Sequence, residues 1–145
     1  MSASKNRIYF LLQRAAHRLK TEADAALSES GGLTTAQAAV MSIVAQDGPV
    51  TQKYIATTLS QRESAITAMA ARLLKAGYIT KVKSVKDARA WSLEATQDGR
   101  NAIKRMRAPF DQINAKLDAL FNDAEMAQLA ERLIQIVETF QNDEP

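Results

Sequence analysis

Residues 51–96 read TQKYIATTLSQRESAITAMAARLLKAGYITKVKSVKDARAWSLEAT, and their pattern is the main basis for predicting the fold. Apolar residues at helical spacing predict two short helices, one beginning near residue 51 and one over residues 61–76. Two strands are predicted at residues 78–83 and 90–93, on either side of a basic turn. Two adjacent helices followed by a cationic hairpin indicate a winged helix-turn-helix, an arrangement suited to binding duplex DNA.

Capping signals mark the boundaries of the two short helices. Thr51 is expected to cap the first helix, and Ser60 with Glu63 has the spacing of a capping box at the start of the second. A helix that ends where another begins is the turn of a helix-turn-helix. Gly77 is expected to close the second helix, because glycine readily adopts the left-handed conformation that ends many helices.

The second short helix is expected to have one apolar side and one small, polar side. Its inward positions are Ile66, Met69, Ala70, Leu73 and Leu74. At about 100° per residue the opposite positions are Gln61, Ser64, Ala68, Ala71 and Lys75, with Ala65 and Arg72 beside them. Small side chains on that side would let the helix backbone approach a groove closely.

Further helices are predicted on both sides of this stretch. One covers residues 5–28, and a buried one opens with a Thr34–Gln37 capping box. After the hairpin, Thr96 is expected to cap a helix over residues 97–121. Asn122 and Glu125 then form the capping box of a final helix.

The predicted fold class is mainly α, an α+β winged helix with helices at both ends. We assign residues 33–99 to the winged helix-turn-helix and residues 1–32 and 100–145 to a helical dimerisation region. A small winged core could not cover the apolar sides of the first and last helices, so these sides indicate an isologous twofold interface. The residues expected in it are Ile8, Leu11, Leu12, Leu117, Leu129, Leu133, Ile136 and Phe140.

The net charge of +3 is unevenly distributed along the chain. Between Gly48 and Leu93, eight lysines and arginines stand against two acidic residues, whereas from Leu120 onward six acidic residues stand against one arginine. A basic middle with an acidic tail indicates that the middle faces a polyanion.

Composition excludes several classes of function. The 145 residues contain no cysteine, which excludes disulfides, thiol redox sensing and cysteine-based zinc sites, and a single histidine argues against a histidine metal site. Five scattered glycines form no phosphate-binding loop, so we expect no enzyme, no catalytic residue, no metal and no cofactor. No apolar run could span a bilayer or form a signal-peptide core, so we expect a soluble, cytoplasmic protein without membrane partners.

Short motifs follow one another in a fixed order along the chain. They are Leu33-Thr34-x-x-Gln37, Gly48-Pro49-Val50-Thr51-Gln52, Ser64-x-x-Thr67 with Arg72-Leu73 and Gly77-Tyr78-Ile79, Asp87-Ala88-Arg89, and Thr96-x-x-Gly99. Their order and spacing resemble the multiple-antibiotic-resistance regulator (MarR) family of bacterial transcription factors over nearly the whole chain. The resemblance implies a homodimer with interlocked first and last helices, whose two winged lobes bind a pseudo-palindromic operator.

Three groups of residues are expected to contact double-stranded DNA. Thr51 and Gln52 begin a helix whose outward amides attract phosphate, a role compatible with capping by Thr51. The recognition helix contributes Gln61, Arg62, Ser64, Ala65, Thr67, Ala68 and Arg72, in or beside a major groove where glutamine can pair with adenine and arginine with guanine. The wing contributes Lys81, Lys83, Lys86, Asp87 and Arg89.

The wing residues are expected to have different roles. Lysine side chains of the wing contact phosphates, which position a protein without reading sequence. Asp87 can hold the Arg89 guanidinium in one orientation for entry into a narrow minor groove. A merely solvated hairpin is the alternative. Trp91 and Tyr78 could stack on a base, but packing beneath the wing is favoured.

The first predicted helix carries three basic residues for which two roles are considered: Arg14, His17 and Arg18. The first is a structural role or a place at the dimer surface. The second is help in binding an anionic effector between the dimerisation region and the winged lobe. The family resemblance implies that aromatic carboxylates often bind in that region.

The leading hypothesis is a dimeric, sequence-specific regulator of transcription, a repressor that a small-molecule effector releases from DNA. The alternative is a winged module that binds a protein partner, or an anti-repressor, and never touches DNA, because fold does not fix function. The positive charge of the middle region disfavours this alternative.

Overall fold

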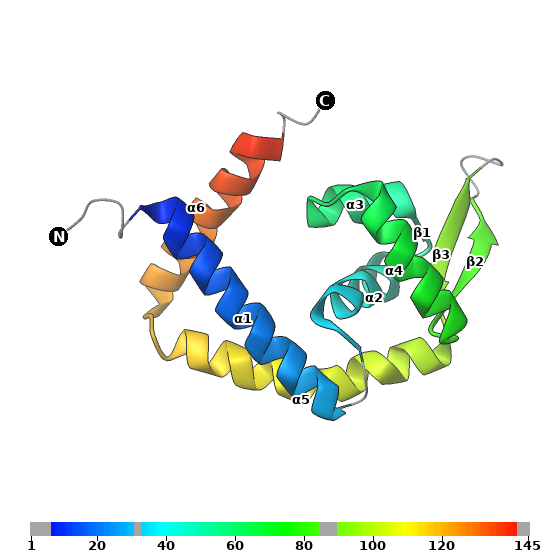
Figure 1. Ribbon diagram of the computed structural model, residues 1–145, viewed down its shortest axis with the longest axis horizontal. Coiled ribbons are helices and arrows are strands. Elements are labelled where there is room, and N and C mark those ends of the chain that lie inside the picture. The colour runs from blue at the N-terminus through cyan, green and yellow to red at the C-terminus, as the bar shows by residue number, and fades with distance from the viewer. Residues whose placement is uncertain (1–6, 31–32, 85–89, 142–145) are drawn as a thin grey trace.

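The computed structural model describes residues 7–30, 33–84 and 90–141 (Figure 1). In chain order the elements are α1 (Ile8–Ser30), α2 (Thr35–Asp47), β1 (Val50–Thr51), α3 (Gln52–Leu59), α4 (Glu63–Lys75), β2 (Ile79–Lys83), β3 (Trp91–Ala95), α5 (Gln97–Asp118) and α6 (Asp123–Gln141). The predicted fold class, mainly α with a small winged sheet, is confirmed.

The small sheet has three antiparallel strands in the order β1-β3-β2. β3 lies in the middle and pairs Val50 with Leu93 on one side and Lys83 with Trp91 on the other. Val50 is buried and forms the short strand β1 with Thr51, and the helix predicted to begin near residue 51 starts at Gln52.

The core is centred on α2, which lies between the helix-turn-helix and α5 (Figure 1). Met41 of α2 packs in one cluster with Ile55, Ile66, Leu73 and Leu93, and each of these side chains is no more than 1% exposed. The helix-turn-helix and the base of the wing therefore share a single core, which holds the recognition helix and the wing in a fixed relation.

Three predicted caps are confirmed. Thr34 and Gln37 form the reciprocal capping box of α2, and Asn122 and Glu125 exchange the equivalent hydrogen bonds before α6. The Thr96 hydroxyl accepts a hydrogen bond from the Gly99 N–H at 3.1 Å and so caps α5.

The predicted capping box of Ser60 with Glu63 is wrong. Ser60 adopts the left-handed conformation, with φ 53° and ψ 44°, and ends α3 by donating its backbone N–H to carbonyl oxygens of that helix. Arg62 is the N-cap of α4, and its side chain makes no capping hydrogen bond within the described residues. A residue already engaged in closing one helix cannot also cap the next.

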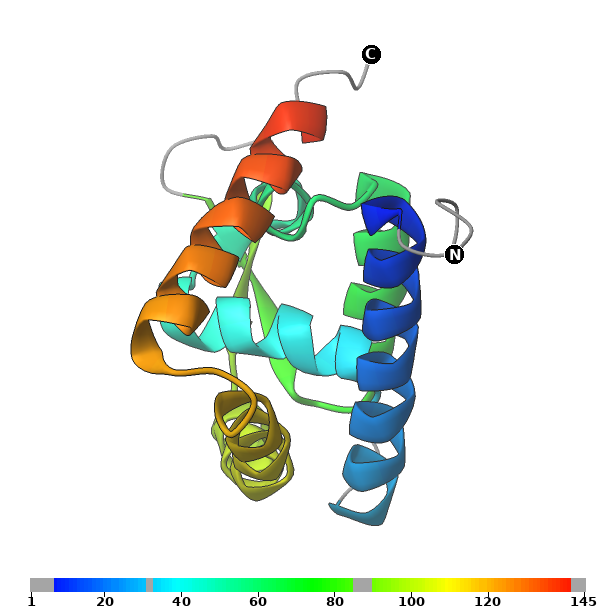
Figure 2. The same cartoon turned by 90° about the vertical axis from the view of Figure 1, so that its left-hand side faces the viewer.

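The terminal helices lie away from the wing. α5 leads from the sheet to the far side of the molecule, where α1 packs against it and the Lys116 ammonium lies 3.1 Å from the Glu22 carboxylate (Figures 1 and 2). α6 turns back from the end of α5 and lies on the opposite side of the molecule from α1 in Figure 2, and none of its residues is buried. Within the described ranges, no helix combines the length and hydropathy of a membrane span.

Candidate nucleic-acid interface

α4 presents a small, polar side to solvent. Ile66, Ala70 and Leu73 are buried and anchor the helix on the core. The residues that sequence reasoning assigned to this side are all exposed: Gln61, Arg62, Ser64, Ala65, Thr67, Ala68 and Arg72. Because most of these side chains are short, the backbone of α4 can approach a major groove, which is wide enough to admit a helix.

The turn before α4 is set by hydrogen bonds to the end of α3. The Gln61 N–H donates to the Ala56 carbonyl oxygen at 2.9 Å, and the left-handed Ser60 reverses the chain. At the other end of α4, Gly77 has φ +79°, a conformation that other residues adopt only with strain. The predicted stop at Gly77 is confirmed.

A polar bridge joins the start of α3 to α4. Thr51 caps α3 by accepting a hydrogen bond from the Tyr54 N–H at 3.1 Å. The Thr67 hydroxyl donates to the Gln52 side-chain oxygen at 2.7 Å. Gln52 is therefore half-buried against the recognition helix, at the position expected to face phosphate.

Two carboxylates brace the helices that support this interface. The Asp24 side chain of α1 accepts hydrogen bonds from the Thr35 hydroxyl and from the Thr35 N–H, the latter at 2.8 Å, and these bonds lower the pKa of Asp24. The Tyr54 hydroxyl donates to Asp47 at 2.9 Å, which raises the pKa of Tyr54. The first contact joins α1 to α2 and the second joins α2 to α3.

The wing carries exposed cations. Lys81 and Lys83 lie on β2 and are exposed. The Ser84 N–H donates to the Ala90 carbonyl oxygen at 3.1 Å and extends the pairing toward the tip. The other predicted wing contacts, at Lys86, Asp87 and Arg89, lie outside the described residues.

The two aromatic residues of the wing differ in burial. Tyr78 is partly buried against the core, as predicted, but the prediction that Trp91 packs beneath the wing is wrong. Trp91 is 53% exposed, because β3 extends past the edge of the core at that end.

Apolar residues of α1 and α6 are exposed in the single chain. Of the residues expected at a dimer interface, Ile8, Leu11, Leu129, Leu133, Ile136 and Phe140 are exposed, whereas Leu12 is half-buried. Tyr9 and Phe10 are also exposed, and sequence reasoning did not single them out. Leu117 is half-buried and lines a pocket between α1, α2 and α5.

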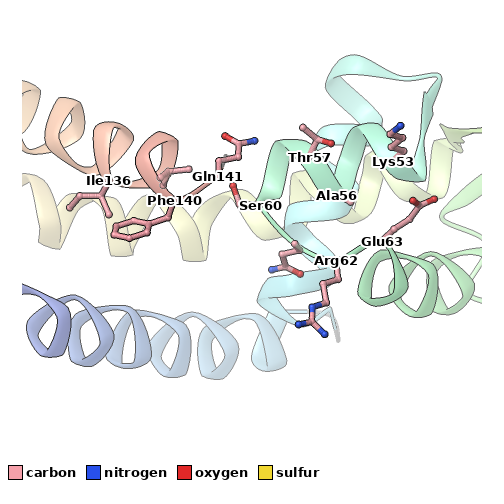
Figure 3. A pocket seen from close by; sticks show the side chains of 11 residues that line it. Lys53, Ala56, Thr57, Ser60, Arg62, Glu63, Ile136, Phe140 and Gln141 are labelled. Atoms are coloured by element: carbon pink, nitrogen blue, oxygen red, sulfur yellow. The ribbon is translucent and has the colours of Figure 1, made fainter. Parts of the chain in front are cut away.

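A cavity of about 580 Å³ separates the end of α6 from the α3–α4 turn. Figure 3 shows Ile136 and Phe140 on one side of this cavity and Ser60 and Arg62 on the other. The apolar side of α6 thus borders open space at the helix-turn-helix.

A second pocket, of about 440 Å³, lies between α1, α2 and α5 and is largely apolar. Its apolar lining includes Leu19, Phe110, Ile113 and Leu117, and its polar lining residues are Lys20, Thr35, Asn114 and, from the α3–α4 turn, Gln61. The expected effector residues Arg14, His17 and Arg18 line a different, shallow depression along α1. Sequence reasoning missed the apolar pocket, because its walls combine residues of α1, α2 and α5 with Gln61 of the α3–α4 turn.

Potential metal ligands are dispersed in the described part of the chain. No group of three or more histidine, cysteine, aspartate or glutamate residues there could hold a metal ion.

Comparison with known proteins gives a consistent result. The model of the MarR family matches residues 33–91. The HTH-type transcriptional repressor MdtR of Bacillus subtilis (strain 168) is 28% identical over 116 residues, which span 80% of this chain and 75% of MdtR.

Solved structures share the fold. CouR from Rhodococcus jostii RHA1, bound to p-coumaroyl-CoA, has a TM-score of 0.83 at 23% identity, over 94% of this chain and 95% of CouR. The MepR–DNA complex of S. aureus has a TM-score of 0.80 at 19% identity, over 91% of this chain and 97% of MepR. The match to the MarR family model thus covers the winged region of this chain, residues 33–91.

Proposed function

We propose that this chain is a homodimeric, sequence-specific DNA-binding regulator of transcription. The observation that carries the proposal is the exposed small and polar side of α4, which lies in one unit with the start of α3 and the lysines of β2. The S. aureus relative in fold, MepR, was solved as a complex with DNA. In the proposed complex, α4 enters a major groove while Lys81 and Lys83 contact phosphates.

The second part of the proposal is the dimer. Ile8, Ile136 and Phe140 are exposed apolar residues on the two terminal helices, and α6 has no buried residue in the single chain. Pairing two copies through these helices would cover the apolar surface and present two α4 helices to half-sites about 34 Å apart. We accordingly divide the chain into the winged region 33–99 and a dimerisation region of residues 1–32 and 100–145.

The third part is regulation by an effector, with repression as the output. The apolar pocket between α1, α2 and α5 is lined by residues of both the dimerisation helices and the winged core, and Lys20 supplies a positive charge in its lining. An aromatic or anionic molecule bound there would act only if it prefers one separation of the two lobes to another. MdtR is named a repressor, and CouR was solved with p-coumaroyl-CoA bound.

Fluorescence anisotropy with a labelled duplex tests DNA binding. A fragment selected from sheared genomic DNA by the purified protein should bind tightly and lose affinity on the order of a thousandfold between about 50 and 200 mM salt, if six or more phosphates are contacted. A salt-independent affinity would contradict the proposal.

Lys83→Ala is a sharper test of the wing. The variant should bind the selected fragment and a random duplex more weakly to the same degree, because phosphates carry no sequence. The slope of the logarithm of its binding constant against the logarithm of the salt concentration should fall in magnitude by about one for each bound lobe. Lys116→Ala is the matched control, since Lys116 is in the last turn of α5 and pairs with Glu22. That end of α5 is the one far from the wing (Figure 1). Equal effects of the two substitutions would contradict the role of Lys83.

Addition of aromatic carboxylates to the preformed complex tests regulation. If an aromatic carboxylate lowers the anisotropy of the wild-type complex but not that of the Ile113→Arg complex, the result would support the apolar pocket as the effector site. Release that persists in this variant would place the effector elsewhere.

A further inference from the structure

Trp91 is the single tryptophan of the chain and is 53% exposed at the end of β3. It lies opposite Lys83 in the sheet. A large aromatic side chain left half in solvent beside cations is typical of a contact surface, because its apolar face gains free energy when a partner covers it.

The exposed indole lies in a defined groove. A space of about 550 Å³ separates the wing from the helix-turn-helix, with Lys81, Ser84 and Trp91 on the wing side and Thr51, Gln52 and Lys53 on the other. Both walls thus carry a lysine. Glu63 is the acidic residue among the described lining residues.

The register of β2 with β3 places two lysines on the face of the sheet that carries Trp91. Lys83 pairs with Trp91, and Lys81 pairs with Leu93, two positions along the same strand. Since side chains alternate between faces, paired residues and their second neighbours share one face. The indole therefore lies on the same face as two exposed lysines, facing the start of α3.

We propose that the Trp91 indole packs against the sugar–phosphate backbone of a DNA strand that runs through this groove. The inference rests on the proposed DNA-binding function. With α4 in a major groove and the wing over the neighbouring minor groove, the strand between the two grooves must pass between α4 and the wing. Duplex bases are stacked inside the helix, so the indole meets deoxyribose, and its N–H can donate to a phosphate oxygen. Lys53 and Lys81 neutralise flanking phosphates.

Because the chain has one tryptophan, its emission reports on this contact directly. Acrylamide quenching of Trp91 emission is measured with and without duplex, while anisotropy of labelled DNA reports binding in the same samples. The expected result is a lower quenching constant once DNA is bound, with selected and random duplexes alike. A constant that does not change in fully bound samples would overturn the inference.

Substitutions give a second readout. Trp91→Ala should weaken binding to both duplexes on the order of tenfold, and Trp91→Phe, which keeps an apolar ring, should weaken it less. Thr80→Ala is the matched control, because Thr80 is exposed on the opposite face of the wing. Circular dichroism verifies the fold of each variant.

The outcomes separate this inference from the proposed function. If the wild type binds DNA and Trp91→Ala binds it with the same affinity, the role of Trp91 is overturned. The DNA-binding function would then still stand. A loss confined to the selected duplex would overturn the backbone contact in favour of a base contact. Failure of the wild type to bind either duplex at low salt would overturn both.

Discussion

The Thr67 hydroxyl on α4 lies 2.7 Å from the side-chain oxygen of Gln52 on α3. Both residues are sequence-predicted DNA contacts, and they contact each other across the helix-turn-helix. Hydrogen bonds between exposed groups contribute little to folding, so this one is expected to act mainly by fixing the orientation of Gln52 before DNA arrives.

A double-mutant cycle tests this orientation. Thr67→Val and Gln52→Leu should each weaken binding to the selected fragment, and the double variant should lose less than the sum, with a coupling of about 1 kcal/mol. The measurement is DNA anisotropy for the four proteins. Strictly additive losses would mean that the two side chains act independently.

Gly99 is expected to tolerate no side chain. A Cβ at this position would lie 2.1 Å from the Tyr78 carbonyl oxygen and 2.8 Å from Cε of Met41. The Tyr78 oxygen also accepts the Thr96 N–H at 3.0 Å, so it cannot move without disturbing the base of the wing. Gly99→Ala should destabilise the fold by about 1–3 kcal/mol in urea unfolding. Lys104→Ala, an exposed substitution on the same helix, should stay within about 0.5 kcal/mol of the wild type.

Asp24 is expected to make folding depend on pH. Hydrogen bonds from Thr35 lower the pKa of Asp24 in the folded state. The folded state thus prefers the ionised form, so the stabilisation is fully present above the ordinary aspartate pKa and is lost as pH falls through the lower, folded-state value. Asp24→Ala should cost about 1–2 kcal/mol at neutral pH.

Urea unfolding at a fixed protein concentration checks the Asp24 prediction. The difference between wild type and Asp24→Ala should be constant near neutral pH and shrink in strong acid. Glu22→Ala serves as the control, because the Glu22–Lys116 pair is exposed and should contribute little. A difference that stays the same in strong acid would show that the carboxylate charge is not involved.

The elements predicted correctly are those whose signals are local. Helix periodicity and the caps at Thr34, Thr96 and Asn122 depend on residues within four positions of one another, so they can be read directly from the sequence. The exposed side of α4 follows from the same periodicity. These local signals were sufficient to predict the fold class and most of the expected recognition surface.

The features that were missed or predicted wrongly depend on contacts between residues that are distant in the sequence. The two-residue strand β1 exists because Val50 pairs with Leu93, and Ser60 adopts a left-handed conformation because α4 must pack on α2. The local pattern at Ser60 fits a capping box equally well. Exposure of Trp91 depends on where β3 leaves the core, and the apolar pocket depends on packing of three helices. Neither is encoded in neighbouring residues.

Phe140 is expected to be essential for dimerisation. It is 68% exposed on α6, on the same side as Leu129, Leu133 and Ile136. A carboxylate placed there would be buried without a partner in the proposed dimer, which is strongly unfavourable, but would stay solvated in a monomer. Phe140→Asp should therefore yield a folded monomer in sedimentation velocity, with helical circular dichroism retained. Gln135→Asp places the same group on the polar side of α6 and should leave the dimer intact. Because only a dimer can engage two half-sites at once, the monomer should also lose most of its affinity for the selected fragment. A Phe140→Asp protein that still sediments as a dimer would exclude this side of α6 from the interface.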